Sequence, residues 1–151
     1  MNKYIPAPEF DKLTTTFPVL KLYQTILQEM PEQHSFSSKL KQHRLSEWSH
    51  LVVRQHQFPN ETESICKKWS EVTDEIVIQV FDEYLKNENI ALFALGKWGS
   101  FELNLSSDID LILVQKSNSN IAPSKIRQFQ NILSSRDSQG FLYRTDFDLR
   151  P

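Results

Sequence analysis

Two aspartates, Asp108 and Asp110, stand at the head of an apolar run and are separated by one residue. Successive side chains of a strand point to opposite faces, so these carboxylates share one face while Ile109 and Leu111 turn into the core. Two like charges about 4 Å apart repel by roughly 4 kcal/mol at an effective dielectric near 20, which raises a pKa or recruits a cation. The ligands are hard oxygens with no Cys or His nearby in sequence, so Mg²⁺ is the expected cation.

A glycine-containing turn, Gly96-Lys97-Trp98-Gly99-Ser100, directly follows the apolar run 90–95. The chain has three glycines, and two of them fall in this turn. Glycine permits positive φ and a close approach of backbone N–H groups to an anion, and Lys97 adds a positive charge. Lys97 fits a phosphate contact and an ordinary surface position equally well. Trp98 either packs beneath the turn, which we favour, or flanks a nucleotide base.

A third candidate strand, Phe141 to Leu149, offers Asp146 and Asp148 at the same two-residue period. A neighbouring strand lies about 4.8 Å away, so one of these residues could complete a site of three carboxylates. An isolated pair of this kind is more often a solvated strand end. The glycine turn and the third strand together favour the metal site.

Three motifs, taken in order, resemble the nucleotidyltransferase core of the glutamate-ammonia ligase adenylyltransferase family. They are GKWGSFELN from Gly96, SSDIDLI from Ser106 and GFLYRTDFDLRP from Gly140, and the resemblance covers roughly residues 90–151. It implies an enzyme that adds AMP to, or removes it from, a tyrosine of glutamine synthetase. The second motif with its flanking ELN is closer to the N-terminal core of that family, which removes AMP by phosphorolysis.

The resemblance also implies a site and its partners. The cofactors are two Mg²⁺ ions and ATP or an AMP-containing nucleotide, and the partners are glutamine synthetase as protein substrate and a PII-type regulatory protein. The carboxylates that match the family's metal ligands and catalytic residues are Asp108, Asp110 and Asp146. The residues placed at the nucleotide phosphates are Gly96, Lys97, Gly99 and Ser100.

Two departures from the family pattern favour an alternative. Asp148 stands where the family typically has Arg, which puts a fourth negative charge on the same strand face. The chain stops at Pro151, where the family continues into a glycine-containing turn and a helical domain. The alternative is a truncated, non-catalytic remnant that binds a nucleotide or a partner.

The pattern of the whole chain predicts an α+β fold. A helical N-terminal region, 1–89, precedes a small mixed β-sheet, 90–151, and the resemblance implies that this sheet is of the polymerase-β-like nucleotidyltransferase type. Prolines at 18 and 31 divide the first helices. Asn60 is the expected N-cap of a long helix that ends near residues 87–89.

Within the predicted core, Ile109 to Val114 is apolar except for Asp110 and indicates a central strand covered on both faces apart from its catalytic end. Pro123 can start a helix that runs through Leu133 and returns the chain to the third strand. Trp48 and Trp69 are the expected core anchors of their helices.

Composition places the chain among water-soluble proteins. It has 151 residues, 39% of them hydrophobic, with a mean hydropathy of −0.45 and a net charge of −2. No apolar run is long enough to cross a bilayer, and the charge gives no bulk attraction to nucleic acid. The single cysteine, Cys66, cannot form an internal disulfide, so a cytoplasmic location is expected, with no membrane and no nucleic-acid partner.

Overall fold

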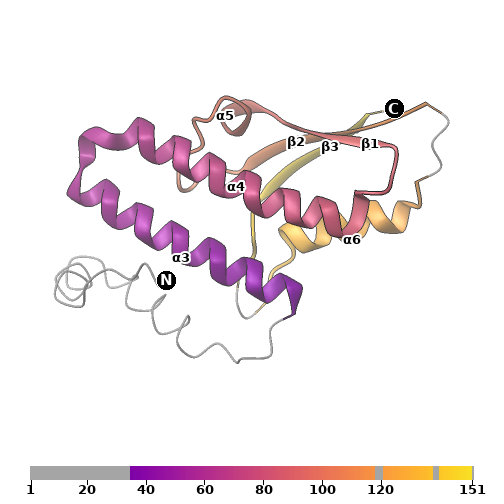
Figure 1. The fold of residues 1–151 in the computed structure, drawn as a ribbon, viewed down its shortest axis with the longest axis horizontal. Helices are drawn as coiled ribbons and strands as arrows, with labels where there is room; N and C mark the ends of the chain where they lie inside the picture. Colours follow the sequence, from indigo (N-terminus) through magenta and orange to yellow (C-terminus); the bar gives the residue numbers. More distant parts are fainter. Residues whose placement is uncertain (1–34, 118–120, 138–139, 151) are drawn as a thin grey trace.

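The computed structural model describes residues 35–117, 121–137 and 140–150. The helices expected before Pro31 therefore lie outside the described residues. Helices and strands follow one another in the order α3 (Phe36–Gln57), a 3₁₀ turn (Pro59–Glu61), α4 (Thr62–Leu85), β1 (Ile90–Ala94), α5 (Gly96–Gly99), β2 (Ile109–Gln115), α6 (Pro123–Ser134) and β3 (Thr145–Arg150). Helices α3 and α4 form an antiparallel pair, and the sheet lies over α4 and α6 (Figure 1). The predicted α+β class is confirmed.

The sheet is mixed, with the strand order β1-β2-β3. β1 and β2 are antiparallel, and α5 lies in the connection between them. β2 and β3 are parallel, and α6 provides the crossover that a parallel pair requires. The parallel register places Ile109 opposite Thr145 and Asp110 opposite Asp146.

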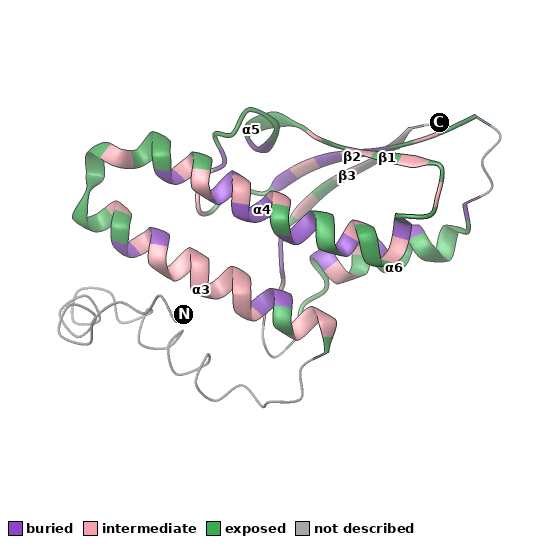
Figure 2. Cartoon of the chain, in the orientation of Figure 1, coloured by how far each residue is buried: buried purple, intermediate pink, exposed green. Residues whose placement is uncertain are grey.

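One face of β2 is buried and the other is open. Ile109, Leu111 and Leu113 are at most 1% exposed, whereas Ile112 is half-buried and Val114 is 36% exposed. The alternation is visible along the strand in Figure 2. The expectation of a strand covered on both faces is therefore wrong for the described part of the chain, because the helices pack against one side of the sheet.

Helix α4 supplies the centre of the hydrophobic core. Its apolar face is buried at Ile65, Trp69, Val72, Ile76, Val80 and Leu85, while Tyr84 is only half-buried. Trp69 is 1% exposed and is confirmed as a core anchor, whereas Trp48 is half-buried and packs at the edge of the core. One cluster of buried residues joins the helices to the sheet. The boundary between a helical region and a core domain at residue 89 stays a prediction.

The expected N-cap at Asn60 is wrong. Pro59 starts a 3₁₀ turn that takes in Asn60, and α4 begins at Thr62 after Glu61, with no side-chain cap. Proline fixes φ near the helical value and so favours a turn at this point. The Thr62 hydroxyl donates to the Pro59 carbonyl at 2.9 Å, which holds the turn.

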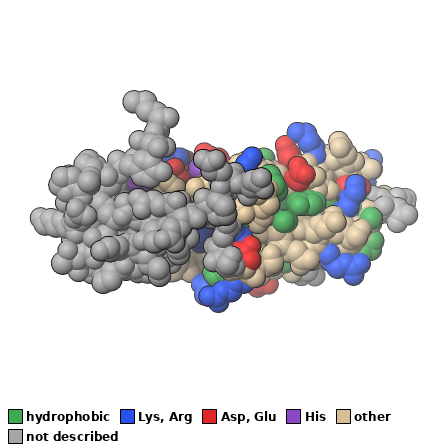
Figure 3. Space-filling model, turned by 90° about the horizontal axis from the view of Figure 1, so that it is seen from below, with side chains coloured by type: hydrophobic (Ala, Val, Ile, Leu, Met, Phe, Trp, Pro, Cys, Tyr) green, Lys and Arg blue, Asp and Glu red, His purple; other side chains and the backbone are tan. Residues whose placement is uncertain are grey.

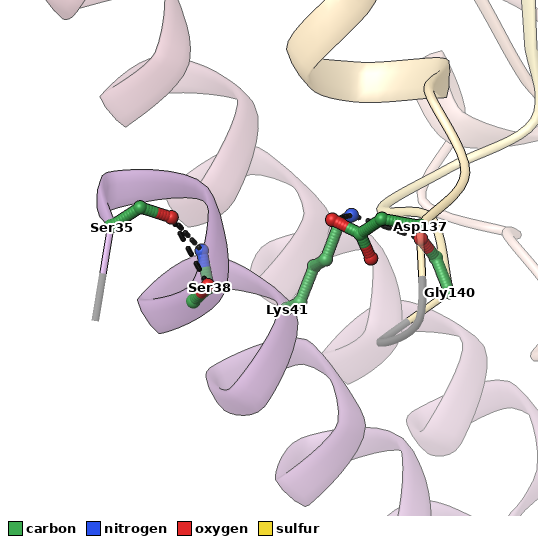
Figure 4. A network of polar contacts seen from close by, with 5 residues as sticks. All are labelled: Ser35, Ser38, Lys41, Asp137 and Gly140. Carbon is green, nitrogen blue, oxygen red and sulfur yellow. Dashed lines mark hydrogen bonds and ion pairs between the residues drawn. The ribbon is translucent and has the colours of Figure 1, made fainter. Parts of the chain in front are cut away.

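A buried lysine ties α3 to the segment before β3 (Figure 4). Ser35 caps the helix by accepting a hydrogen bond from the Ser38 backbone N–H at 3.2 Å. One turn further on, the Lys41 ammonium lies 2.8 Å from an Asp137 carboxylate oxygen and donates to the Gly140 carbonyl at 2.9 Å. The Lys41 side chain is 2% exposed, and such burial requires these partners because an isolated buried charge is costly.

The third strand begins at Thr145, four residues later than the predicted Phe141. Leu142 and Tyr143 are both buried, at 0% and 2% exposure, so they do not alternate as strand residues would. The Tyr143 backbone N–H donates to the Leu133 carbonyl at 2.8 Å, which fastens this segment to α6 instead.

The described surface mixes charges of both signs. In Figure 3, Lys and Arg side chains lie interspersed with Asp and Glu outside the grey atoms, around a small hydrophobic cluster. This pattern agrees with a net charge of −2. Within the described ranges, no helix combines the length and apolar character that a membrane span demands.

Because Tyr143 is buried, the free energy of unfolding should fall as the pH rises into the alkaline range. Burial raises its pKa from 10.0 to about 12, and the nearby Thr73 hydroxyl and Arg44 guanidinium offset only part of this effect. The hydroxyl forms no well-aligned hydrogen bond with the described residues. As pH rises past 10, the unfolded chain loses its proton first, so about 2–3 kcal/mol of stability present below pH 10 is lost by about pH 12. The free energy of unfolding, measured with urea across this pH range, should decline less for Tyr143→Phe than for the matched control Tyr84→Phe.

Candidate functional site

Two acidic residues face each other across the parallel pair of strands. Asp110 of β2 and Asp146 of β3 are register partners, so their side chains share the open face of the sheet on strands about 4.8 Å apart. Asp110 is half-buried and Asp146 is exposed. Asp148 follows at the register position opposite Ile112. The structure thus brings together two of the three carboxylates singled out in the sequence.

The third carboxylate, Asp108, is engaged by an arginine. Its Oδ1 lies 2.6 Å from the Arg144 Nε, and the same guanidinium donates to the Ser106 carbonyl at 2.7 Å. Sequence reasoning missed Arg144. A signal was present, because Arg144 precedes Asp146 by two residues just as Asp108 precedes Asp110, and the parallel register aligns the two pairs.

The glycine turn packs directly against Asp110. Gly96 has φ of +53°, and a Cβ at this position would overlap Oδ2 of Asp110. The Leu95 backbone N–H donates to the Asp110 carbonyl at 2.9 Å, which joins the turn to β2. A Cβ on Gly99 would lie 2.6 Å from the Ala94 carbonyl oxygen. Close approach to the backbone therefore requires glycine at position 99, whereas the positive φ favours glycine at position 96, and the turn lies beside the acidic pair.

The other two residues of the turn that were singled out, Lys97 and Ser100, are exposed. The Ser100 hydroxyl is exposed and lies 3.2 Å from the Gly96 carbonyl and 3.3 Å from the Lys97 carbonyl, so it caps its own turn. Lys97 is exposed on the outer surface of α5. These observations do not assign the side chain of Lys97 or Ser100 to a ligand.

Trp98 packs beneath the turn, as favoured from the sequence. It is 3% exposed, and its indole N–H donates to Oδ1 of Asp74 on α4 at 2.8 Å. Burial raises the pKa of Asp74 above its usual value of 3.8, although the hydrogen bond from Trp98 acts in the opposite direction. Asp74 was missed by sequence reasoning because nothing in the helical pattern distinguishes it from a surface carboxylate.

The donor chemistry of this site fits a divalent cation such as Mg²⁺, because Asp108, Asp110 and Asp146 all offer hard carboxylate oxygens. The arrangement itself is incomplete. Among the described residues, no three Asp, Glu, His or Cys side chains are grouped closely enough to hold a metal ion. The engagement of Asp108 by Arg144 agrees with that result.

A sequence model of the family described as glutamate-ammonia ligase adenylyltransferase matches residues 3–151. The chain belongs to this family. The match reaches well beyond residues 90–151, which carry the motifs, and so includes the helical region.

Similar proteins are bifunctional glutamine synthetase adenylyltransferase/adenylyl-removing enzymes. The one from Mannheimia succiniciproducens is 38% identical over 76 residues, which are 42% of this chain and 8% of the relative. The one from Pasteurella multocida is 39% identical over 72 residues, 40% of this chain and 7% of the relative. The one from Mannheimia haemolytica is 28% identical over 153 residues, 83% of this chain and 16% of the relative. The chain therefore spans only a small part of the length of these curated relatives.

Replacing Gly96 should disturb the site more than replacing Gly140. Both residues have positive φ, +53° and +90°, so an alanine at either costs about 1–2 kcal/mol in backbone strain. Only at Gly96 does the new Cβ also overlap Asp110, whereas nothing lies within 4 Å of it at Gly140. Urea unfolding should show Gly96→Ala less stable than Gly140→Ala by about 1 kcal/mol or more. Equal losses would contradict the contact between the turn and Asp110.

Two substitutions at Asp74 should separate its charge from its hydrogen bond. Asp74→Asn keeps an oxygen that can accept from Trp98, and it removes a charge that burial disfavours. Its stability relative to wild type should increase as pH rises through the raised pKa of Asp74. Asp74→Leu leaves the buried indole N–H without an acceptor and should cost about 1–2 kcal/mol. Thermal unfolding over a pH series measures both effects, and equal stability of the two variants at every pH would refute the role of the bond.

Proposed function

We propose that this chain contributes a nucleotidyltransferase site that moves AMP onto or off a tyrosine of glutamine synthetase. The observation that carries the proposal is the placement of Asp110 opposite Asp146, with Gly96 packed against the Asp110 carboxylate. Membership of the family supports the class of reaction. The activity for which the relatives are named, adenylyl transfer and adenylyl removal on glutamine synthetase, supports the substrate.

Each residue of the site has a proposed role. Asp110 and Asp146, with Asp108 once it leaves Arg144, would hold two Mg²⁺ ions. Bound Mg²⁺ polarises a phosphoryl group and stabilises charge on the entering and leaving oxygens. The turn residues would lie under the phosphates of ATP or of an AMP-containing nucleotide, and these are Gly96, Lys97, Gly99 and Ser100. The chain acts chiefly by positioning the reacting groups.

Removal of AMP by phosphorolysis is the slightly favoured direction. An oxygen of inorganic phosphate attacks the phosphorus of the adenylyl group, the bond to the tyrosine oxygen breaks, and that oxygen takes up a proton. The products are ADP and unmodified tyrosine. In the attaching direction, a tyrosine hydroxyl attacks the α-phosphorus of ATP and pyrophosphate leaves. A PII-type regulatory protein is the further partner proposed from the family resemblance.

A second candidate function is a binding module without turnover. The ion pair between Asp108 and Arg144 favours it, because this contact occupies one of the three carboxylates. In this alternative, the turn and the acidic pair keep affinity for a nucleotide and Mg²⁺.

The two functions differ in whether AMP moves. We expect the purified chain, with Mg²⁺ and either labelled ATP or phosphate, to transfer AMP to or from glutamine synthetase. Asp110→Asn and Asp146→Asn should each reduce this rate by roughly 100-fold or more, because they remove charge that holds the metal against the reacting phosphoryl group. Asp82→Asn, on the exposed side of α4, is the matched control and should keep the wild-type rate.

Transfer that survives in Asp110→Asn would refute the proposed site. No transfer by wild type, combined with a rise in Tm on adding Mg²⁺ and ATP that is lost in Asp110→Asn, would establish the binding module instead.

A further inference from the structure

The connection between β1 and β2 contains a phenylalanine with a left-handed backbone. Phe101 has φ of +61°, and among the residues that the structure describes it is the sole non-glycine residue with positive φ. It directly follows Ser100, the C-cap of α5. A bulky L side chain is strained in this region of backbone conformation, where glycine is the usual residue. Strain of this kind persists only where the surrounding structure enforces it, and it is concentrated at functional sites.

Backbone hydrogen bonds at the end of α5 hold Phe101 in this conformation. The Phe101 N–H donates to the Trp98 carbonyl at 3.0 Å, and the Glu102 N–H donates to the Lys97 carbonyl at 2.7 Å. These two bonds form the Schellman motif that commonly ends a helix, with phenylalanine in the position that glycine usually takes. Glycine would end α5 in the same way with less strain, so the geometry of the turn does not account for an aromatic residue here.

Helix α4 fastens the segment on both sides of Phe101. Asp74 accepts the hydrogen bond from the Trp98 indole. The Ser70 hydroxyl oxygen accepts another from the Leu103 backbone N–H at 3.2 Å. Trp98 and Leu103 are buried, whereas Phe101 is 46% exposed. The neighbours of Phe101 therefore fix its backbone, while much of its side chain remains in contact with water.

The exposed ring belongs to the same short segment as the turn assigned to the nucleotide phosphates. Helix α5 has only four residues, so it spans about 6 Å between Gly96 and the residue before Phe101. The sequence offered Trp98 as a ring that could flank a nucleotide base, but Trp98 is buried beneath the turn. Phe101 is the other aromatic residue of the segment 96–103, and it stays accessible, as the exposed colouring of the chain after α5 shows in Figure 2.

We propose that the ring of Phe101 is the surface against which the adenine base of the nucleotide stacks. The inference rests on the proposed function, which puts the nucleotide phosphates at the turn 96–100. A base that covers the ring removes exposed aromatic surface from water, and every base has a π face that can stack. Because α4 and the Schellman motif fix the backbone beforehand, ordering of this segment costs little on binding. The strain at residue 101 keeps an aromatic side chain beside the phosphates.

Calorimetric titration of the whole chain with Mg·ATP and with Mg·triphosphate, which has the phosphates without the base, tests the inference. We expect wild type to bind Mg·ATP more tightly. Phe101→Gly should raise Kd for Mg·ATP by about tenfold, because the stacking contact is lost, and should leave Kd for Mg·triphosphate unchanged. The Tm of this variant should rise by about 2–4 °C, because glycine relieves the strain.

Two further variants separate stacking from the shape of the turn. Phe101→Trp keeps an aromatic face and should keep the wild-type Kd for Mg·ATP. Phe58→Gly is the matched control, since Phe58 is 52% exposed and lies between α3 and the 3₁₀ turn, outside the segment 96–103. Both of its Kd values should equal those of wild type.

An unchanged Kd for Mg·ATP in Phe101→Gly would overturn the inference alone. An equal rise in Kd for both ligands would do the same, because Phe101 would then only shape the turn. Equal affinity of wild type for the two ligands would leave the phosphate site standing and refute the stacking. Wild type that binds neither ligand would overturn the proposed nucleotide site and this inference with it.

Discussion

The parallel pairing of β2 with β3 is the constraint on which the candidate site depends. It sets Asp110 opposite Asp146, and it sets the residues two positions earlier, Asp108 and Arg144, beside each other. A shift of the register by one residue would send one strand's acidic side chains to the buried face of the sheet. The buried residues of β2, such as Leu111, oppose that shift because they fill the core beneath the sheet. Burial of hydrophobic side chains on one face of the sheet thus fixes which acidic side chains meet on the other face.

The helical region takes a direct part in the site. Asp74 on α4 accepts the hydrogen bond from Trp98, and Trp98 lies under the glycine turn that contacts Asp110. Lys41 on α3 binds the segment that leads into β3, at the end of the sheet where β2 also begins. The family match over residues 3–151 is in keeping with this arrangement, since helices and sheet together position the acidic face.

Local patterns in the sequence were enough to predict α3, α4 and α6, the three strands and the burial of Trp69 and Trp98. They failed where a neighbouring proline or a tertiary contact decides the outcome. Pro59 overrode the capping tendency of Asn60, and the packing of Tyr143 on α6 delayed the start of β3. The open face of β2 was missed because an apolar run cannot show which of its sides a helix will cover.

Within the site, Arg144 and Asp74 were also missed because local sequence patterns do not reveal tertiary contacts. Each acts on a partner distant in sequence, and neither belongs to a pattern read along one segment. The ion pair of Arg144 also has an electrostatic reason. Carboxylates about 4 Å apart repel by roughly 4 kcal/mol at an effective dielectric near 20, so a neighbouring guanidinium stabilises the acidic face when no cation is bound. A divalent ion that takes Asp108 as a ligand must displace Arg144, and the strength of this pair therefore sets part of the affinity for the metal.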